Sequence, residues 1–211
     1  MRVARSLRSY VVRYDSGFAP NPFWGHCTLA TCKPQIRGST QLNDWIVGTG
    51  SNSQNIRRGG KLVYAMRITE IISTTDYWND PRFSNKKPNL HGSYRQACGD
   101  NIYYPNIDGT WGQLNSFHSM NDGTPNPRHI ARDTRVQRVL VSSDFVYFGG
   151  EGPELLDSVE AARGLGILKT NMGHLRQQDP KAIAVFEKWL RGRGVSGYQG
   201  RPWDILANQQ G

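Results

Sequence analysis

The chain has 211 residues, enough to bury one hydrophobic core, so we expect one domain with a terminal appendage. Its 26 Lys and Arg against 17 Asp and Glu give a formal net charge of +9. Such an excess favours a polyanionic partner, with a basic surface kept only for solubility as the alternative. No run of about eighteen apolar residues occurs, which excludes a transmembrane helix, and we expect no membrane partner.

The cysteines and the N-terminal residues indicate a compartment. Three cysteines are an odd number and do not suggest a disulfide framework. Residues 1–8 carry three arginines, but residues 9–15 are too short and too polar for the apolar part of a signal peptide. We therefore expect the protein in the reducing cytoplasm.

Strands are predicted along much of the chain. The run from Tyr10 to Tyr14 is β-branched and aromatic and precedes Ser16-Gly17, which predicts a strand over residues 9–15. The same reasoning predicts strands at residues 25–32, 44–48, 61–72 and 136–148. Residues 62–66 are apolar in succession, which is typical of a strand covered on both faces.

The segment between Thr75 and Arg135 is polar and has few apolar repeats, so we expect a long loop. Its aromatic residues argue against disorder, and we expect the loop to fold over the sheet. The aromatic residues are Tyr77, Trp78, Phe83, Tyr94, Tyr103, Tyr104, Trp111 and Phe117.

One helix is predicted near the C-terminus. Asp179 can cap it, Pro180 suits its first position, and Gly192 ends it. Ile183, Phe186, Trp189 and Leu190 recur on one face, as expected of core residues. The predicted fold is α+β: a β-rich domain over residues 1–175, with a C-terminal helix and tail over residues 176–211 packed on it.

Two local patterns resemble ligand sites but do not fit them. Cys27 and Cys32 lie beside His26, yet residues five apart in a strand point to opposite faces, so we expect buried thiols and no metal site. The glycines at residues 48–50 and 149–152 lack the spacing of a Walker or Rossmann phosphate loop, and hairpin turns and a bulge explain them. No cofactor is expected.

A third pattern suits a planar base, because aromatic rings can stack on its faces while polar groups read its edge. Each aromatic residue of this pattern taken alone is typical of a core residue. The candidate ligand-binding residues are Phe23, Trp24, Asp44, Trp45, Phe117 and His118. Basic residues on or between the predicted strands are candidates for contacts with a nucleic-acid backbone, namely Arg13, Arg37, Arg57, Arg58, Lys61 and Arg67.

Several longer motifs resemble a known family. They are Tyr10-Val11-Val12-Arg13-Tyr14-Asp15, Gly17-Phe18-Ala19-Pro20-Asn21-Pro22-Phe23, residues 27–37 (CTLATCKPQIR), residues 44–50 (DWIVGTG), residues 77–83 (YWNDPRF) and residues 144–150 (DFVYFGG). Over residues 9–175 the chain resembles the second group of the nucleotide modification associated domain proteins, a bacterial and phage family. The resemblance implies a context of modified DNA bases and names no reaction.

A second resemblance concerns the fold. Residues 43–48 (NDWIVG) followed by residues 62–68 (LVYAMRI) are similar to EVE and ASCH modules of the PUA-like class. This similarity implies a small barrel. EVE relatives recognise modified bases with aromatic cages, whereas some ASCH relatives are hydrolases with a Lys, Thr and Glu set, and Asn43 replaces the usual Gly before the Asp.

These observations leave three hypotheses open. The leading one is a module that recognises a modified nucleobase or nucleotide, with DNA carrying modified bases as the expected partner. It needs no nucleophile, and the sequence shows no Ser-His-Asp or Cys-His set. The rival is a hydrolase or group transferase acting on a nucleobase or nucleotide, with His118, Asp44, Asp100 and Asp144 as acid or base candidates. The third is a structural subunit with an exposed apolar patch. The sequence does not distinguish DNA from RNA and leaves the oligomeric state open.

Overall fold

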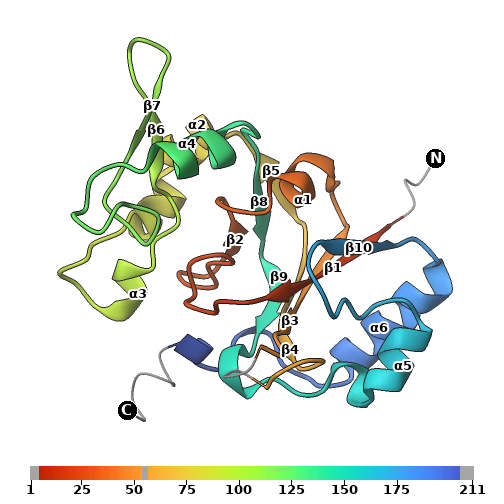
Figure 1. The fold of residues 1–211 in the computed structure, drawn as a ribbon. Coiled ribbons are helices and arrows are strands. Elements are labelled where there is room, and N and C mark those ends of the chain that lie inside the picture. Colours follow the sequence, from red (N-terminus) through yellow and green to blue (C-terminus); the bar gives the residue numbers. More distant parts are fainter. Residues whose placement is uncertain (1–4, 54–56, 205–211) are drawn as a thin grey trace. The chain divides into compact units, whose positions relative to one another are not determined.

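The computed structural model describes residues 5–53 and 57–204, so residues 1–4 and 205–211 of the predicted terminal segments lie outside the described residues. The chain forms two compact units, each built from separate stretches of sequence. Unit 1 combines the N-terminal stretch up to Ser16 with Gln41–Thr69 and the stretch from Ser143 onward. Unit 2 combines Gly17–Thr40 with Glu70–Ser142. Helices α1 to α6 and strands β1 to β10 of the two units are labelled in Figure 1.

Unit 1 is organised around a six-stranded mixed sheet in the order β10-β1-β3-β4-β9-β11. Its strands are β1 (Leu7–Val12), β3 (Trp45–Gly50), β4 (Leu62–Arg67), β9 (Asp144–Tyr147), β10 (His174–Gln177) and β11 (Gly197–Tyr198). Strands β1 and β3 run parallel, as do β9 and β11, and the other neighbours run antiparallel. All six residues of β3 are buried, as expected of a strand covered on both faces.

Helices α5 (Val159–Gly164) and α6 (Pro180–Arg191) supply apolar residues to the core of unit 1. The predicted helix is confirmed, because the side chain of Asp179 accepts a hydrogen bond from the amide of Lys181 and the helix ends at Gly192. Phe186 of α6 packs edge-on against Trp45, with ring centroids 5.4 Å apart. Unit 1 also contains the short 3-10 helices η2 (Gly149–Glu151) and η3 (Leu155–Asp157).

Unit 2 has less regular structure. Its strands are β2 (Cys27–Leu29), β5 (Glu70–Ile72), β6 (Tyr103–Pro105), β7 (Trp111–Gln113) and β8 (Val139–Ser142). They form a three-stranded sheet, β2-β8-β5, and a two-stranded sheet, β6-β7. Its helices are α1 (Pro34–Ser39), α2 (Thr74–Asn79), the 3-10 helix η1 (Pro81–Lys86), α3 (Tyr94–Ala97) and α4 (Pro127–Thr134).

The structure confirms the α+β class and corrects three predictions. No closed barrel forms in the described part of the chain, so the sheets do not reproduce the predicted PUA-like barrel. The predicted strands over residues 61–72 and 136–148 are each two strands, one in each unit. The predicted loop between Thr75 and Arg135 contains four helices and two strands. These elements are too short for apolar residues to repeat along them in the sequence.

The two glycine clusters belong to unit 1. Gly48 lies inside β3, where a Cβ atom would collide with the ring of Tyr64, and the register of β3 and β4 shifts between Gly48 and Thr49. This irregularity is the predicted bulge. Gly48 and Gly50 lie in β3, whereas Gly149 and Gly150 lie in η2, so neither cluster forms the predicted hairpin turn. None of the described helices is long and apolar enough to cross a membrane.

Candidate functional site

Unit 2 brings together a thiol, an imidazole and a carboxylate in series. The Sγ atom of Cys32 lies 3.4 Å from Nε2 of His118, within hydrogen-bond distance for sulfur. On the other side of the ring, Nδ1 of His118 lies 3.0 Å from Oδ2 of Asp133. A nucleophile next to a base that a third group orients is the geometry of covalent catalysis by cysteine.

The backbone of Cys32 is held in an uncommon conformation. Strand β2 ends at Leu29, and Cys32 and Lys33 have positive φ angles of 56° and 42° before α1 begins at Pro34. Left-handed backbone at residues other than glycine costs about 1 to 3 kcal/mol and persists only where its surroundings enforce it. Here the amide of Cys32 donates to Oδ1 of Asp133 at 3.0 Å, and its carbonyl accepts from Nε of Arg37 at 2.8 Å.

His118 lies in a tight turn after β7. Its amide donates to the Oγ of Ser116 at 3.3 Å, and its carbonyl oxygen lies 2.9 Å from Nδ1 of His129. The ring of Phe18 meets the imidazole edge-on, with centroids 4.6 Å apart. The imidazole is therefore fixed by packing as well as by its two polar neighbours.

Asp133 is in the last turn of α4, a helix that begins after the cap Asn126, whose side chain accepts from two backbone amides. Its side chain is completely buried, and both of its oxygens accept hydrogen bonds. Tyr103 donates its hydroxyl to Oδ2 at 2.9 Å, and Arg132 donates Nε to Oδ1 at 2.8 Å. These donors stabilise the ionised carboxylate without help from solvent.

The electrostatics of this group favour a charged imidazole. Burial alone would lower the pKa of His118, but its contacts with Asp133 and Cys32 outweigh burial and raise that pKa above its ordinary value. Burial would raise the pKa of Asp133, but His118 and Arg132 outweigh it and hold that pKa well below its usual range. Burial, together with the neighbouring Asp133, raises the pKa of the Tyr103 hydroxyl, so Tyr103 acts only as a donor.

Cys32 differs from the other two thiols in exposure. Cys27 and Cys98 are completely buried, whereas Cys32 is partly exposed. Three large aromatic side chains of unit 2 also face solvent: Phe117, beside His118, is 45% exposed, Trp24 is 39% exposed and Tyr94 is 36% exposed. The three-residue group is therefore open to solvent on the side of Cys32.

The predicted ligand-binding residues fall into both units. Phe23, Trp24, Phe117 and His118 belong to unit 2, whereas Asp44 and Trp45 belong to unit 1. Phe23 is buried, and the guanidinium of Arg95 lies 5.8 Å from its ring centroid.

Asp44 and Trp45 serve the scaffold of unit 1. Asp44 is buried and accepts from the amides of Ser6 and Gln41, at 2.8 and 3.0 Å. Trp45 is 1% exposed, and its indole nitrogen donates to Glu187 at 2.8 Å. Neither residue is part of the group around Cys32.

The other acid candidates have structural partners. Asp100 is buried in unit 2, where Tyr77 and Thr28 donate their hydroxyls to it, each at 2.7 Å. Burial raises the pKa of Asp100. Asp144 of unit 1 pairs with Arg67 and Arg191, each at 2.6 Å.

The basic residues that are candidates for contacts with a nucleic-acid backbone differ in how far their side chains are exposed to solvent. Arg37 is completely buried, and its guanidinium donates to the carbonyls of Cys32, Val136, Arg138 and Asp133. Arg37 therefore supports the backbone and does not face a phosphate. Arg58 is also buried, donates to the carbonyl of Gly149 and lies over the ring of Trp203. The side chains that face solvent are Arg13, Arg57 and Lys61, while Arg67 is partly exposed in its pair with Asp144.

The sequence does not reveal that Cys32, Tyr103, Arg132 and Asp133 belong to one site. The dipeptide Asn126-Pro127 is a helix-start signal that could have located α4 and thereby Asp133. No local signal connects Cys32 with residues 86 and 101 positions further along the chain.

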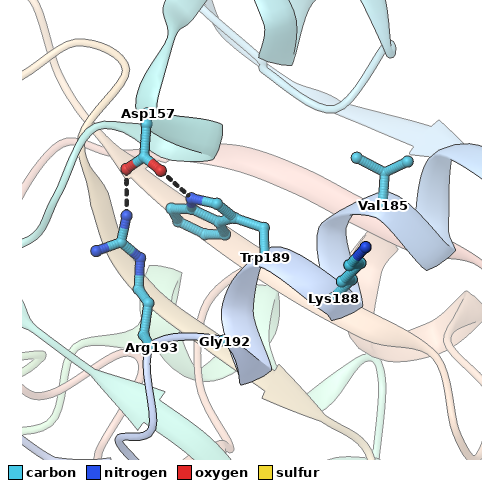
Figure 2. Close-up of a pocket in the computed structure, with 6 residues that line it drawn as sticks. All are labelled: Asp157, Val185, Lys188, Trp189, Gly192 and Arg193. Carbon is cyan, nitrogen blue, oxygen red and sulfur yellow. Dashed lines mark hydrogen bonds and ion pairs between the residues drawn. The ribbon is translucent and has the colours of Figure 1, made fainter.

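Unit 1 contains a separate surface groove of about 690 Å³, shown in Figure 2. Asp157 is its polar centre: it accepts from the indole nitrogen of Trp189 at 2.8 Å and pairs with Arg193, which lies over the Trp189 ring. The groove is lined by Asp157, Val185, Lys188, Trp189, Gly192 and Arg193. Asp157 and Arg193 neutralise each other, and none of the six lining residues is a cysteine, serine or threonine.

In the described residues, no three His, Cys, Asp or Glu side chains gather as ligands for one metal ion. The chain is an α+β protein in which Cys32, His118 and Asp133 lie in series within hydrogen-bond distance. The family model of nucleotide modification associated domain 2 matches residues 4–209, and the chain belongs to this family, as its motifs suggested. No curated protein and no solved structure matches the chain significantly.

Proposed function

We propose that this protein is a thiol-dependent enzyme of nucleotide modification, a hydrolase or group transferase that acts on a nucleobase or nucleotide. The observation that carries the proposal is the series Cys32, His118 and Asp133, with 3.4 Å from Sγ to Nε2 and 3.0 Å from Nδ1 to Oδ2. Membership of the family supports the substrate class, because its name associates the domain with nucleotide modification.

Each residue has a defined role in the proposed reaction. Cys32 passes its proton to Nε2 of His118, and Sγ forms a bond to an electrophilic carbon of the substrate. The bond from that carbon to its leaving group breaks, and the imidazolium protonates the leaving group. Water or an acceptor then gives its proton to His118 and attacks the same carbon, and the C–S bond breaks with return of the proton to Cys32. Asp133 keeps the ring oriented and stabilises the imidazolium.

Alkylation by iodoacetamide tests the nucleophile without knowledge of the substrate. Cys27 and Cys98 are completely buried, so the folded protein should take up one label, on Cys32. Because the thiolate is the reactive species, His118→Asn should slow labelling at pH 7 by about tenfold or more. Equal labelling rates in the wild type and in His118→Asn would contradict the proposal.

Turnover tests the substrate class. Natural and modified nucleosides and nucleotides are incubated with the protein and with Cys32→Ser, and the products are analysed by mass spectrometry. We expect the wild type to alter at least one compound and Cys32→Ser to alter none. The buried control Cys98→Ser should keep activity wherever it folds, because Cys98 is completely buried whereas Cys32 is partly exposed.

Recognition of a modified base without chemistry is the second candidate. The observation that favours it is the exposed ring of Phe117 next to His118, which offers a stacking surface. The turnover experiment, combined with a thermal-shift measurement on the same compounds, separates the two candidates. Binding that raises the melting temperature equally in the wild type and in Cys32→Ser, with no product, supports recognition.

A further inference from the structure

Arg132 contacts both the nucleophile and the carboxylate of the group around Cys32. Its Nε and Nη2 atoms donate to Oδ1 and Oδ2 of Asp133, at 2.8 and 3.1 Å, which is the two-point pairing of a guanidinium with a carboxylate. The side chain of Asp133 is completely buried, so this pairing fixes the plane of the guanidinium. In this position Nη2 lies 3.8 Å from Sγ of Cys32 and 3.5 Å from Nδ1 of His118.

The guanidinium of Arg132 retains donors for a ligand. It carries several N–H groups in a rigid planar fork, and Asp133 accepts one from Nε and one from Nη2. The Nη1 atom donates to no atom in the part of the chain that the structure describes. The Arg132 side chain is also 38% exposed. A ligand at Cys32 can therefore accept a hydrogen bond from Arg132 without displacing Asp133.

Three other donors near Cys32 are already committed. The amide of Cys32 donates to Oδ1 of Asp133 at 3.0 Å, whereas in the serine-protease arrangement the amide of the nucleophile helps to bind the oxyanion. Tyr103 gives its hydroxyl hydrogen to Oδ2 of the same carboxylate. Arg37 is completely buried, and its guanidinium donates to backbone carbonyls. Compared with these donors, Arg132 is both partly exposed and close to Sγ.

We infer that Arg132 is a catalytic residue that binds the oxygen of a substrate carbonyl group, so that Cys32 attacks a carbonyl carbon and not a saturated carbon. The inference rests on the proposed function for the nucleophile, and it names the kind of carbon on which that nucleophile acts. Attack forms the S–C bond and moves the π electron pair of the C=O bond onto oxygen. The pair returns when the bond to the leaving group breaks, and the leaving group takes its proton from His118.

The position of Arg132 suits this charge. The oxyanion is separated from Sγ by one carbon atom, and Nη2 of Arg132 lies 3.8 Å from Sγ. Donors that are already oriented toward a developing oxyanion stabilise the transition state, because they need no reorganisation during the reaction. Asp133 supplies this orientation through its two hydrogen bonds with the guanidinium. Attack on a saturated carbon passes the electron pair directly to the leaving group and creates no oxyanion, so it would not use Arg132.

Two reagents for the same thiol test the inference without knowledge of the substrate. p-Nitrophenyl acetate acetylates Sγ of Cys32 through attack on a carbonyl carbon, and its nitrophenolate leaves without a proton. Iodoacetamide alkylates Sγ through attack on a saturated carbon. Both rates are measured by mass spectrometry of the folded protein, with Cys32→Ser as the background. Because both reactions require the thiolate, the ratio of acetylation to alkylation is independent of the amount of thiolate.

Arg132→Met should lower this ratio by about tenfold or more, since loss of one oxyanion donor costs an enzyme about 100- to 1000-fold in rate. The matched control is Arg128→Met, which removes an exposed arginine one turn earlier on α4 and should leave the ratio unchanged. His118→Asn should lower both rates and leave the ratio unchanged. An unchanged ratio in Arg132→Met would overturn the inference.

The two buried thiols show whether a variant is folded. Cys27 and Cys98 are completely buried and should stay unlabelled in the folded protein. If Arg132→Met is labelled at these thiols, Arg132→Lys takes its place, because it keeps the positive charge beside Asp133 and loses the planar fork. The ratio should then fall by a smaller factor, and an unchanged ratio would again overturn the inference.

The outcomes separate this inference from the proposed function. Slower alkylation in His118→Asn, with an unchanged ratio in Arg132→Met, would keep the nucleophile and reject the role of Arg132. Equal alkylation of the wild type and His118→Asn would reject the proposed activation of the thiol. A lowered ratio in Arg132→Met would in that case still support the contact between Arg132 and the oxyanion.

Discussion

The buried backbone groups of the two units find their hydrogen-bond partners in different ways. In unit 1, a six-stranded sheet pairs the backbone groups with one another along continuous strands. In unit 2, the strands have three or four residues, and buried side chains such as Arg37, Asn21 and Lys86 bind the backbone carbonyls or each other instead. Non-glycine residues with positive φ angles occur in both units, and in unit 2 the side chains of Asp133 and Arg37 hold the backbone of Cys32 in this conformation.

Loss of Arg37 should show the largest difference between the units. Arg37→Met removes four hydrogen bonds to carbonyl oxygens of unit 2, and each is worth about 1 kcal/mol. We expect the free energy of unfolding to fall by about 4 kcal/mol in urea titrations. The control is Arg67→Met in unit 1, which breaks a partly exposed ion pair with Asp144 and should cost about 1 kcal/mol. Equal costs would show that unit 2 does not depend on its side-chain supports.

In unit 1, Asp15 should make the free energy of unfolding depend on pH. Burial raises its pKa to about 6, although Tyr147 and the amide of Trp203 donate hydrogen bonds to its carboxylate. Because the folded state holds the proton more tightly, the stabilising contribution is complete below about pH 4 and is lost as the pH rises through 6. The shift from 3.8 to about 6 corresponds to about 3 kcal/mol.

The measurement compares urea titrations of the wild type and of Asp15→Asn at pH 4 and at pH 7. We expect the wild type to lose stability relative to the variant by about 2 kcal/mol over this interval, since the unfolded state is already partly ionised at pH 4. A difference that does not change with pH would show that Asp15 is ionised in the folded state at both values. The carboxylate of Asp133 behaves in the opposite way, since its lowered pKa adds stability that is lost in acid.

The contrast between the units also explains which helices and strands the sequence predicts and which contacts of the site it does not predict. The strands β1, β3, β4 and β9 and the helix α6 were visible because apolar runs and caps mark them locally. Residues 25–32 were expected to form one strand, which would point Cys27 and Cys32 to opposite faces. Strand β2 ends at Leu29, and the positive φ of Cys32 turns the chain toward His118. His118 was predicted as a candidate from its aromatic neighbours, but its thiol and carboxylate partners depend on the tertiary fold of unit 2.

Removal of one helix cap from each unit gives a matched comparison, with an expected cost of about 1 kcal/mol in each case. Asn126 caps α4 of unit 2, and Asp179 caps α6 of unit 1. Replacement of either by Ala should cost about 1 kcal/mol, measured by thermal or urea unfolding. Only Asn126→Ala should also slow alkylation of Cys32, because α4 carries Asp133. Equal labelling rates in the two cap variants would indicate that the position of Asp133 does not depend on the start of α4.

The smallest effect on stability is expected at Phe117. Its ring is 45% exposed and touches Phe18, with centroids 5.9 Å apart, so Phe117→Ala should change the free energy of unfolding by about 0.5 kcal/mol or less. If the ring stacks on the base of a bound nucleotide, that nucleotide should protect Cys32 from alkylation about tenfold less well in the variant, because base stacking on an aromatic ring is worth about 1 to 3 kcal/mol. Phe117→Tyr keeps the stacking surface and should retain protection. Loss of protection in both variants would point to packing of the turn that carries His118 and not to stacking on the base.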